Sequence, residues 1–187
     1  MAIKVTRFAV LVLAALALTM ESAHVLELPQ KLTYDATTYS LVNTTLYRWF
    51  AVVGGAYQIG SIAGALLLTW LLRSTRAMGL TAAGAALLVA AFLVWLAVVA
   101  PVNGRIADAL AQAADTVPAL WMQLRARWEF GHAAGFVLQL AGFGFLVGSV
   151  LVDTNPVVHN GNHARAGHAR ADRIGVSKRA TIAGQHH

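Results

Sequence analysis

The chain carries the stretch Arg125-Ala126-Arg127-Trp128-Glu129-Phe130-Gly131-His132 at the start of its last long apolar run, which continues over residues 132–152. Glu129 and His132 are three residues apart, so in a helix their side chains lie on one face. A second pair with this spacing, Glu21 and His24, follows the first apolar run. If the two helices meet at the same membrane surface, the carboxylates and imidazoles of both pairs come together.

The composition is that of a membrane protein. Of the 187 residues, 58% are hydrophobic and 12% are charged, and the mean hydropathy is +0.62, whereas soluble domains contain about 25% charged residues. The chain has no cysteine, which excludes disulfides, thiolate metal sites and thiol nucleophiles. The net charge of +6 comes from basic residues beside apolar segments and in the tail. This placement favours a role in membrane orientation and argues against nucleic-acid binding.

Four apolar runs cover residues 8–20, 50–72, 80–100 and 132–152. Because a membrane span needs about 20 residues, we expect the short first run to continue as a helix to Leu28, where Pro29 ends it. A cleaved signal peptide is the alternative interpretation of this first run.

The connecting segments carry their own signals. Residues 29–47 are typical of an interfacial loop or a short surface helix, and residues 105–124 of a surface-lying helix followed by a turn. Pro101, followed by Asn103 and Gly104, predicts that the third helix ends at residue 100. In the second run, Gly60 and Gly64 predict close approach of another helix.

These elements predict an all-α fold, a four-helix transmembrane bundle with short interfacial helices over residues 1–152. Residues 153–187 are basic and rich in histidine, with few large apolar residues, which predicts a disordered cytoplasmic tail. An even number of spans places both termini on one side, and a small excess of basic residues there favours an N-in, C-in orientation in a plasma or inner membrane.

Alternation of the helices also places the end of helix one, the end of helix three and the start of helix four at one membrane face. Ionisable groups in or beside membrane spans are costly and often mark function. Six side chains at this face are therefore candidate site residues together with Glu21: His24, Glu27, Asn103, Trp128, Glu129 and His132.

Three chemistries remain open for the ionisable members of this set. His24, Glu27, Glu129 and His132 are candidate ligands of a single metal ion, although they are too few for a carboxylate-bridged di-metal site. Alternatively, they relay protons with no metal ion. A third reading is structural, with the glutamates neutralised by Lys31, Arg125 and Arg127.

Three groups of residues carry a resemblance to a known family: His24-Val25-Leu26-Glu27-Leu28-Pro29 followed by Lys31, then Pro101-Val102-Asn103, then Arg127-Trp128-Glu129 with His132. Over residues 8–152 the chain resembles the anthrone oxygenase-like family of small four-helix membrane proteins. Members with an assigned activity oxidise anthrones to anthraquinones with dioxygen. The resemblance implies this chemistry, which needs a base and a site for a planar aromatic substrate. By chemical type and placement, His24 or His132 is the candidate base, Glu27 or Glu129 the residue orienting it, and Asn103 and Trp128 the substrate contacts.

The lipid bilayer is the expected partner of this chain, and two hypotheses follow for its function. One is a membrane oxidoreductase that acts on a small aromatic substrate. The other is a non-enzymatic membrane protein, either a partner subunit or a small-molecule binder, in which the Glu/His pairs are structural. The sequence leaves the oligomeric state and the presence of a metal ion open.

Overall fold

A computed structural model describes residues 1–154, the side chains of the last two excepted. All regular structure in this range is helical. The elements are α1 (Ala2–Lys31), α2 (Ala36–Thr45), α3 (Phe50–Leu71), α4 (Met78–Val94), the π-helical turn η1 (Trp95–Val99), α5 (Ala100–Gln112), the 3₁₀ turn η2 (Ala114–Thr116) and α6 (Val117–Thr154). The prediction of a disordered tail falls on residues 155–187, outside the described range.

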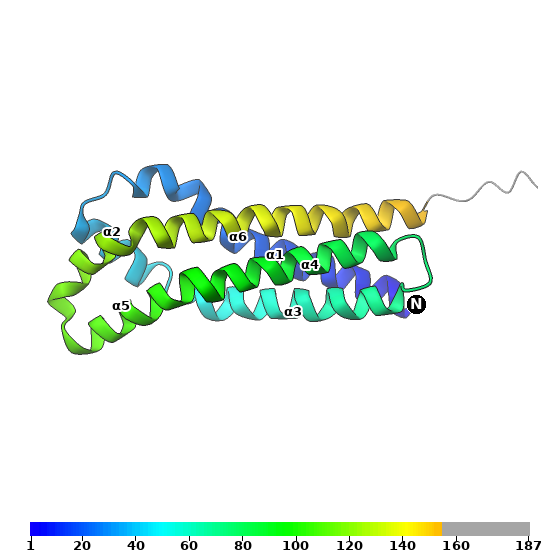
Figure 1. Cartoon of the computed structure of the whole chain (residues 1–187), viewed down its shortest axis with the longest axis horizontal. Coiled ribbons are helices and arrows are strands. Elements are labelled where there is room, and N and C mark those ends of the chain that lie inside the picture. The colour runs from blue at the N-terminus through cyan, green and yellow to red at the C-terminus, as the bar shows by residue number, and fades with distance from the viewer. Residues whose placement is uncertain (155–187) are drawn as a thin grey trace, which may run out of the picture. The chain divides into compact units, whose positions relative to one another are not determined.

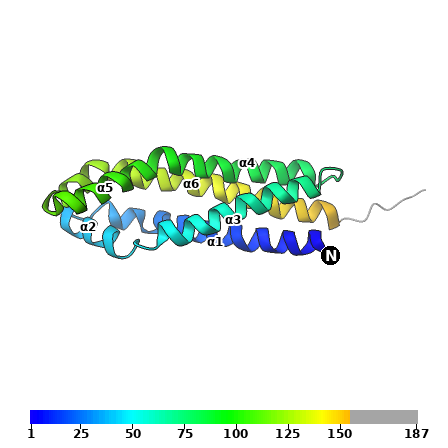
Figure 2. The same ribbon diagram turned by 90° about the horizontal axis from the view of Figure 1, so that it is seen from below.

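Four helical stretches are long and apolar enough to cross a membrane: Ala2–Lys31, Phe50–Leu71, Met78–Gln112 and Ala114–Val152. The chain is therefore an integral membrane protein, and the predicted all-α bundle is confirmed. Helix α1 packs against α3 and α6, and α4 packs against the same two helices. The N-terminus and the α3–α4 turn lie at one end of the bundle, and α2 and α5 lie at the other (Figures 1 and 2).

Small residues set the distances between the helices in the middle of the bundle. A Cβ atom on Gly84 of α4 would lie 2.9 Å from Leu146 Cγ and 3.0 Å from the Gly142 oxygen of α6. A Cβ atom on Gly64 of α3 would lie 2.6 Å from Val10 Cγ2 of α1. The predicted close approach at Gly60 and Gly64 is thus confirmed, with α1 as the partner helix.

The bundle is longer than a bilayer is thick. The 35 residues of Met78–Gln112 measure about 50 Å at the rise of an α-helix, against about 30 Å for the hydrocarbon core. Helix α3, with 22 residues, matches this core, and Trp49 and Trp70 are exposed at its two ends as expected for interfacial aromatics. The remaining length lies beyond Trp49. There, α2, α5 and the adjoining ends of α1 and α6 form a compact group (Figure 1), which we call the cap.

The expectation that Pro29 ends the first helix is wrong. Pro29 lies inside α1, which continues to Lys31. Proline weakens a helix because it lacks the N–H group and constrains the residue before it, but this local preference is overridden by contacts of the following turn. Lys31, the last residue of the continued helix, is buried and lies near two glutamates.

The expectation that Pro101 ends the third helix is also wrong. The chain passes through η1 directly into α5, and the Ala100 N–H donates to the Trp95 oxygen, five residues back. A π-helical turn of this kind accommodates a local disruption without ending the helix. Pro101 cannot donate to the Ala97 oxygen, and Arg127 Nη2 of α6 donates to that oxygen at 3.1 Å. Residues 105–112 therefore continue α5 and do not form a separate surface helix.

The α4–α6 contact yields a prediction for helix packing. Gly84→Ala should lower the free energy of unfolding in detergent by about 1–3 kcal/mol, since the added methyl group overpacks the contact with Leu146 and the Gly142 backbone. Gly79→Ala is the matched control in α4, where a Cβ atom would meet nothing within 4 Å. Thermal unfolding followed by circular dichroism measures both. Equal stability of the two variants would contradict the packing described.

Candidate functional site

The two histidines of the sequence motifs meet inside the bundle. The ring centroids of His24 in α1 and His132 in α6 are 4.0 Å apart, and both side chains are buried. Trp128, one turn before His132, packs edge-on against both imidazoles, with centroid distances of 4.8 Å to His24 and 4.5 Å to His132. The ring of Tyr47, two residues after the end of α2, packs against the His24 imidazole with a centroid distance of 4.5 Å. The predicted proximity of His24 and His132 is confirmed.

The carboxylate beside the histidines is that of Glu21. Its Oε2 atom lies 2.8 Å from His132 Nδ1, and this contact joins α1 to α6. Gly135, one turn after His132, lies beside this carboxylate, because a Cβ atom there would be in ordinary contact with Glu21 Oε2, at 3.4 Å. If Nδ1 donates its hydrogen to Glu21, the Nε2 lone pair of His132 is available as a base.

The other two glutamates of the predicted site have a different partner. Lys31 Nζ lies 3.5 Å from Glu27 Oε2 and 3.7 Å from Glu129 Oε1, and the lysine and Glu129 are each only 1% exposed. The ammonium group also lies over the ring of Tyr47, at 4.1 Å from its centroid. Glu27 and Glu129 thus neutralise Lys31, in line with the structural reading of these two residues. They belong to a polar cluster separate from the histidines.

Helix α2 supplies the second partner of Glu129. The hydroxyl group of Tyr39 donates to Glu129 Oε1 at 2.7 Å. Burial, and then the negative charge of Glu129, raise the pKa of Tyr39, so the phenol stays protonated and remains a donor. Asp35 begins α2 by accepting a hydrogen bond from the Thr38 N–H at 2.7 Å, which lowers the pKa of its exposed carboxyl group.

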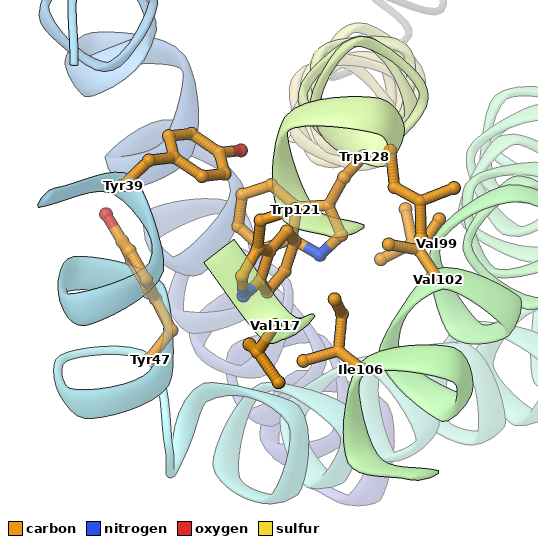
Figure 3. Packing of buried hydrophobic residues seen from close by; sticks show 9 residues of the cluster. Tyr39, Tyr47, Val99, Val102, Ile106, Val117, Trp121 and Trp128 are labelled. Carbon is orange, nitrogen blue, oxygen red and sulfur yellow. The ribbon is translucent and has the colours of Figure 1, made fainter. Parts of the chain in front are cut away.

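Asn103 positions Trp128. The indole Nε1 donates to Asn103 Oδ1 at 2.9 Å, so these two predicted substrate contacts form one unit between α5 and α6. Figure 3 shows Trp121 and Trp128 packed between the tyrosines on one side and the valines of η1 and α5 on the other. This apolar cluster fixes the cap and, with it, the indole ring that contacts both imidazoles.

A cavity of about 440 Å³ lies beside the histidines, a size typical of small-molecule sites. Its wall combines the polar site residues with apolar and small residues of α3, α4 and α5. Its lining residues include Glu21, His24, Gly55, Gln58, Trp95, Asn103, Trp121, Trp128, His132 and Gln139. No atom lies within 4 Å of a Cβ position on Gly55, so this glycine widens the space.

The predicted metal ligands do not form a metal site in the structure. Within residues 1–154, no group of three or more His, Asp or Glu side chains is placed to hold a metal ion. His132 Nδ1 faces Glu21, and the oxygens of Glu27 and Glu129 face Lys31. The set of His24, Glu27, Glu129 and His132 is therefore split between two different polar clusters.

Comparison of the chain with protein-family models, with curated proteins and with solved structures gives no match. The family resemblance thus stays a prediction from the sequence.

Several residues of the site were missed by the sequence analysis. Tyr39, Tyr47 and Trp121 come from segments with no periodic signal that would place them at a site. Gln58 and Gln139 did carry a signal in the sequence, because a polar side chain in an apolar span turns toward the bundle interior. Glu21 was placed at the correct membrane face but received no role.

The Lys31–Glu129 pair yields a prediction for stability. Lys31→Met should destabilise the protein by about 3–5 kcal/mol, because it leaves the buried Glu129 carboxylate without its cation. The double substitution Lys31→Met and Glu129→Gln should recover a large part of that loss. Chemical unfolding in detergent measures both, with Lys4→Met as the exposed control. If the double variant loses as much unfolding free energy as Lys31→Met and Glu129→Gln lose together when each is made alone, the two residues are not directly coupled.

Proposed function

We propose that this protein is a membrane oxidoreductase that removes a proton from a small aromatic substrate and oxidises it with dioxygen. The observation that carries the proposal is the partly buried Glu21–His132 contact of 2.8 Å on the wall of a cavity of small-molecule size. The resemblance to the anthrone oxygenase-like family supports the same chemistry. We further propose that both termini face the cytoplasm, as the basic residues indicate, which places the cap on the opposite side.

His132 is the base in this proposal. Glu21 holds the imidazole through Nδ1 and stabilises the imidazolium that forms when Nε2 takes up a proton. This arrangement amends the expectation from the sequence, in which Glu27 or Glu129 orients the base. The ring of His24 lies 4.0 Å from that of His132, at an interplanar angle of 32°, and limits the rotation of the His132 ring.

The reaction proposed for an anthrone-type substrate balances without a further reactant. The base removes a proton from the methylene carbon, and the electron pair left behind spreads over the fused rings and the carbonyl oxygen. Dioxygen is the oxidant. The methylene carbon loses two hydrogens and gains one oxygen atom to become a carbonyl carbon, and the second oxygen atom leaves as water.

The surroundings of the base fit an apolar, planar substrate. Trp95 and Trp128 contribute flat aromatic surfaces to the cavity wall, and Asn103 holds the indole of Trp128 in place. The exposed residues among those lining the cavity are Arg48, Ala51 of α3, and Ala107 and Leu110 of α5, so its open side carries one cationic group beside apolar side chains. We place the entrance for a lipid-soluble substrate there, where the bundle meets the cap.

The test is oxidation of anthrone by the purified protein, followed by dioxygen uptake and anthraquinone absorbance. His132→Ala should lower the catalysed rate by about 100-fold or more, the usual contribution of a general base, and Glu21→Gln should lower it less. Asp108→Asn, an exposed carboxylate of α5 in the same cap, is the control and should keep the rate. If His132→Ala keeps the wild-type rate, His132 is not the base. If the wild-type protein does not accelerate anthrone oxidation, the non-enzymatic alternative holds.

A further inference from the structure

The entrance of the cavity carries one charged side chain. The exposed part of the lining consists of Arg48, which precedes α3, Ala51 of α3, and Ala107 and Leu110 of α5. The entrance therefore lies between the start of α3 and α5, where the bundle meets the cap. A guanidinium group at this place gives the entrance a positive charge beside apolar side chains.

The guanidinium group of Arg48 has no partner in the part of the chain that the structure describes, apart from an aromatic neighbour. It makes no hydrogen bond and no ion pair there, and its carbon atom lies 5.8 Å from the ring centroid of Trp49. Arg125 and Arg127 of the same cap, by contrast, donate to backbone oxygens. The N–H donors of Arg48 are thus available to a ligand, and they match a carboxylate through two parallel hydrogen bonds.

Asn103 supplies a second donor, whose direction is fixed by Trp128. The indole N–H can only donate, so the side-chain oxygen of Asn103 must accept from it, at 2.9 Å. The NH₂ group of Asn103 is left. Within residues 1–154 this group has no hydrogen-bond partner, and it is not fully buried. Asn103 lies one turn before Ala107 on α5 and lines the same cavity, so its NH₂ group can meet an acceptor inside the entrance.

The inner part of the cavity offers space for an apolar body. Met20 of α1, Phe50 of α3 and Phe92 of α4 line it. Along α3 the lining extends from Phe50 to Gln58, which are about 12 Å apart along the helix axis. Exposed Trp49 marks the membrane interface at this end of α3. The cavity is therefore polar at the level of the lipid head groups and apolar toward the middle of the bundle.

We infer that the cavity binds a carboxylate amphiphile, with its carboxylate at Arg48 and Asn103 and its apolar body between α1, α3 and α4. A cationic head group would be repelled by Arg48, and the one carboxylate of the lining, Glu21, is already paired with His132. A neutral head group would forgo the charge-assisted hydrogen bonds. The inference does not rest on the proposed function, because it concerns the head group that the cavity recognises. If both hold, the aromatic substrate carries a carboxylate.

The inference is tested by binding of 11-bromoundecanoate and its neutral methyl ester to the protein in phosphatidylcholine nanodiscs, at a pH where the acid is ionised. Bromine quenches tryptophan fluorescence on contact, and Trp95, Trp121 and Trp128 line the cavity. A Trp49→Phe, Trp70→Phe variant removes the two exposed tryptophans at the ends of α3. In this variant the acid should quench saturably and bind about tenfold more tightly than the ester, as expected for hydrogen bonds to a charged group.

Substitution of the two donors should remove this preference. With Arg48→Gln added, the acid and the ester should bind within about twofold of each other. Arg105→Gln removes the same charge from an exposed position of α5 outside the cavity lining and should keep the preference. Asn103→Asp keeps an acceptor for the Trp128 indole but replaces the NH₂ donor by an oxygen atom, so it should weaken binding of the acid several-fold and change binding of the ester little.

The remaining outcomes would overturn the inference. Equal affinity for acid and ester, or a preference that Arg48→Gln leaves unchanged, would show that the entrance does not recognise a carboxylate. Quenching without saturation, or quenching confined to Trp49 and Trp70, would place the probe in the lipid. Saturable quenching of the cavity tryptophans by brominated phosphatidylcholine would assign Arg48 to a lipid phosphate. Anthrone takes no part in these measurements, so their result is independent of the rate found for His132→Ala.

Discussion

The hydrogen-bonded contact between Glu21 and His132 joins α1 to α6 where the apolar bundle passes into the cap. Beside membrane-spanning segments the charge of an unpaired carboxylate would be costly, so Glu21 needs a partner. His132 supplies it, and Gly135 lies next to the carboxylate. The register of α6 against α1 follows, because a shift by one residue would turn His132 away. The stacking of His24, the position of Trp128 and the wall of the cavity all depend on that register.

A second polar cluster stabilises the cap from outside the site. Lys31 pairs with Glu27 and Glu129, and Tyr39 donates a hydrogen bond to Glu129 Oε1. This cluster connects α1, α2 and α6 and keeps its charges apart from the histidines. Of the three glutamates, only Glu21 lines the cavity. The rings of Tyr47 and Trp128 contact both the ammonium group and the imidazoles. One cluster thus joins the helices of the cap, and the other lies on the cavity wall.

The fold was largely predictable from the sequence, because the length of the apolar runs identifies membrane spans. Successive spans cross the membrane in opposite directions, which decides which helix ends lie on the same side. The errors arose at Pro29 and Pro101, where a local backbone preference was taken as decisive. At Pro101 a π-helical turn and a hydrogen bond from Arg127 to Ala97 carry the helix onward, and neither is visible in a sequence pattern. Co-localisation of His24 and His132 followed from topology. Topology did not show which of Glu21, Glu27 and Glu129 pairs with His132, because this depends on where the side chains of Lys31 and Tyr39 lie.

The register of α1 against α6 can be measured directly because the chain contains no cysteine. In a Glu21→Cys, Gly135→Cys variant the two introduced thiols should form a disulfide on mild oxidation and resist later labelling with a maleimide polymer. A Glu21→Cys, Gly144→Cys variant should stay fully labelled, because a Cβ atom on Gly144 meets nothing within 4 Å. Full labelling of the first variant, or equal protection of both, would show that Glu21 does not face this part of α6 and would contradict the site.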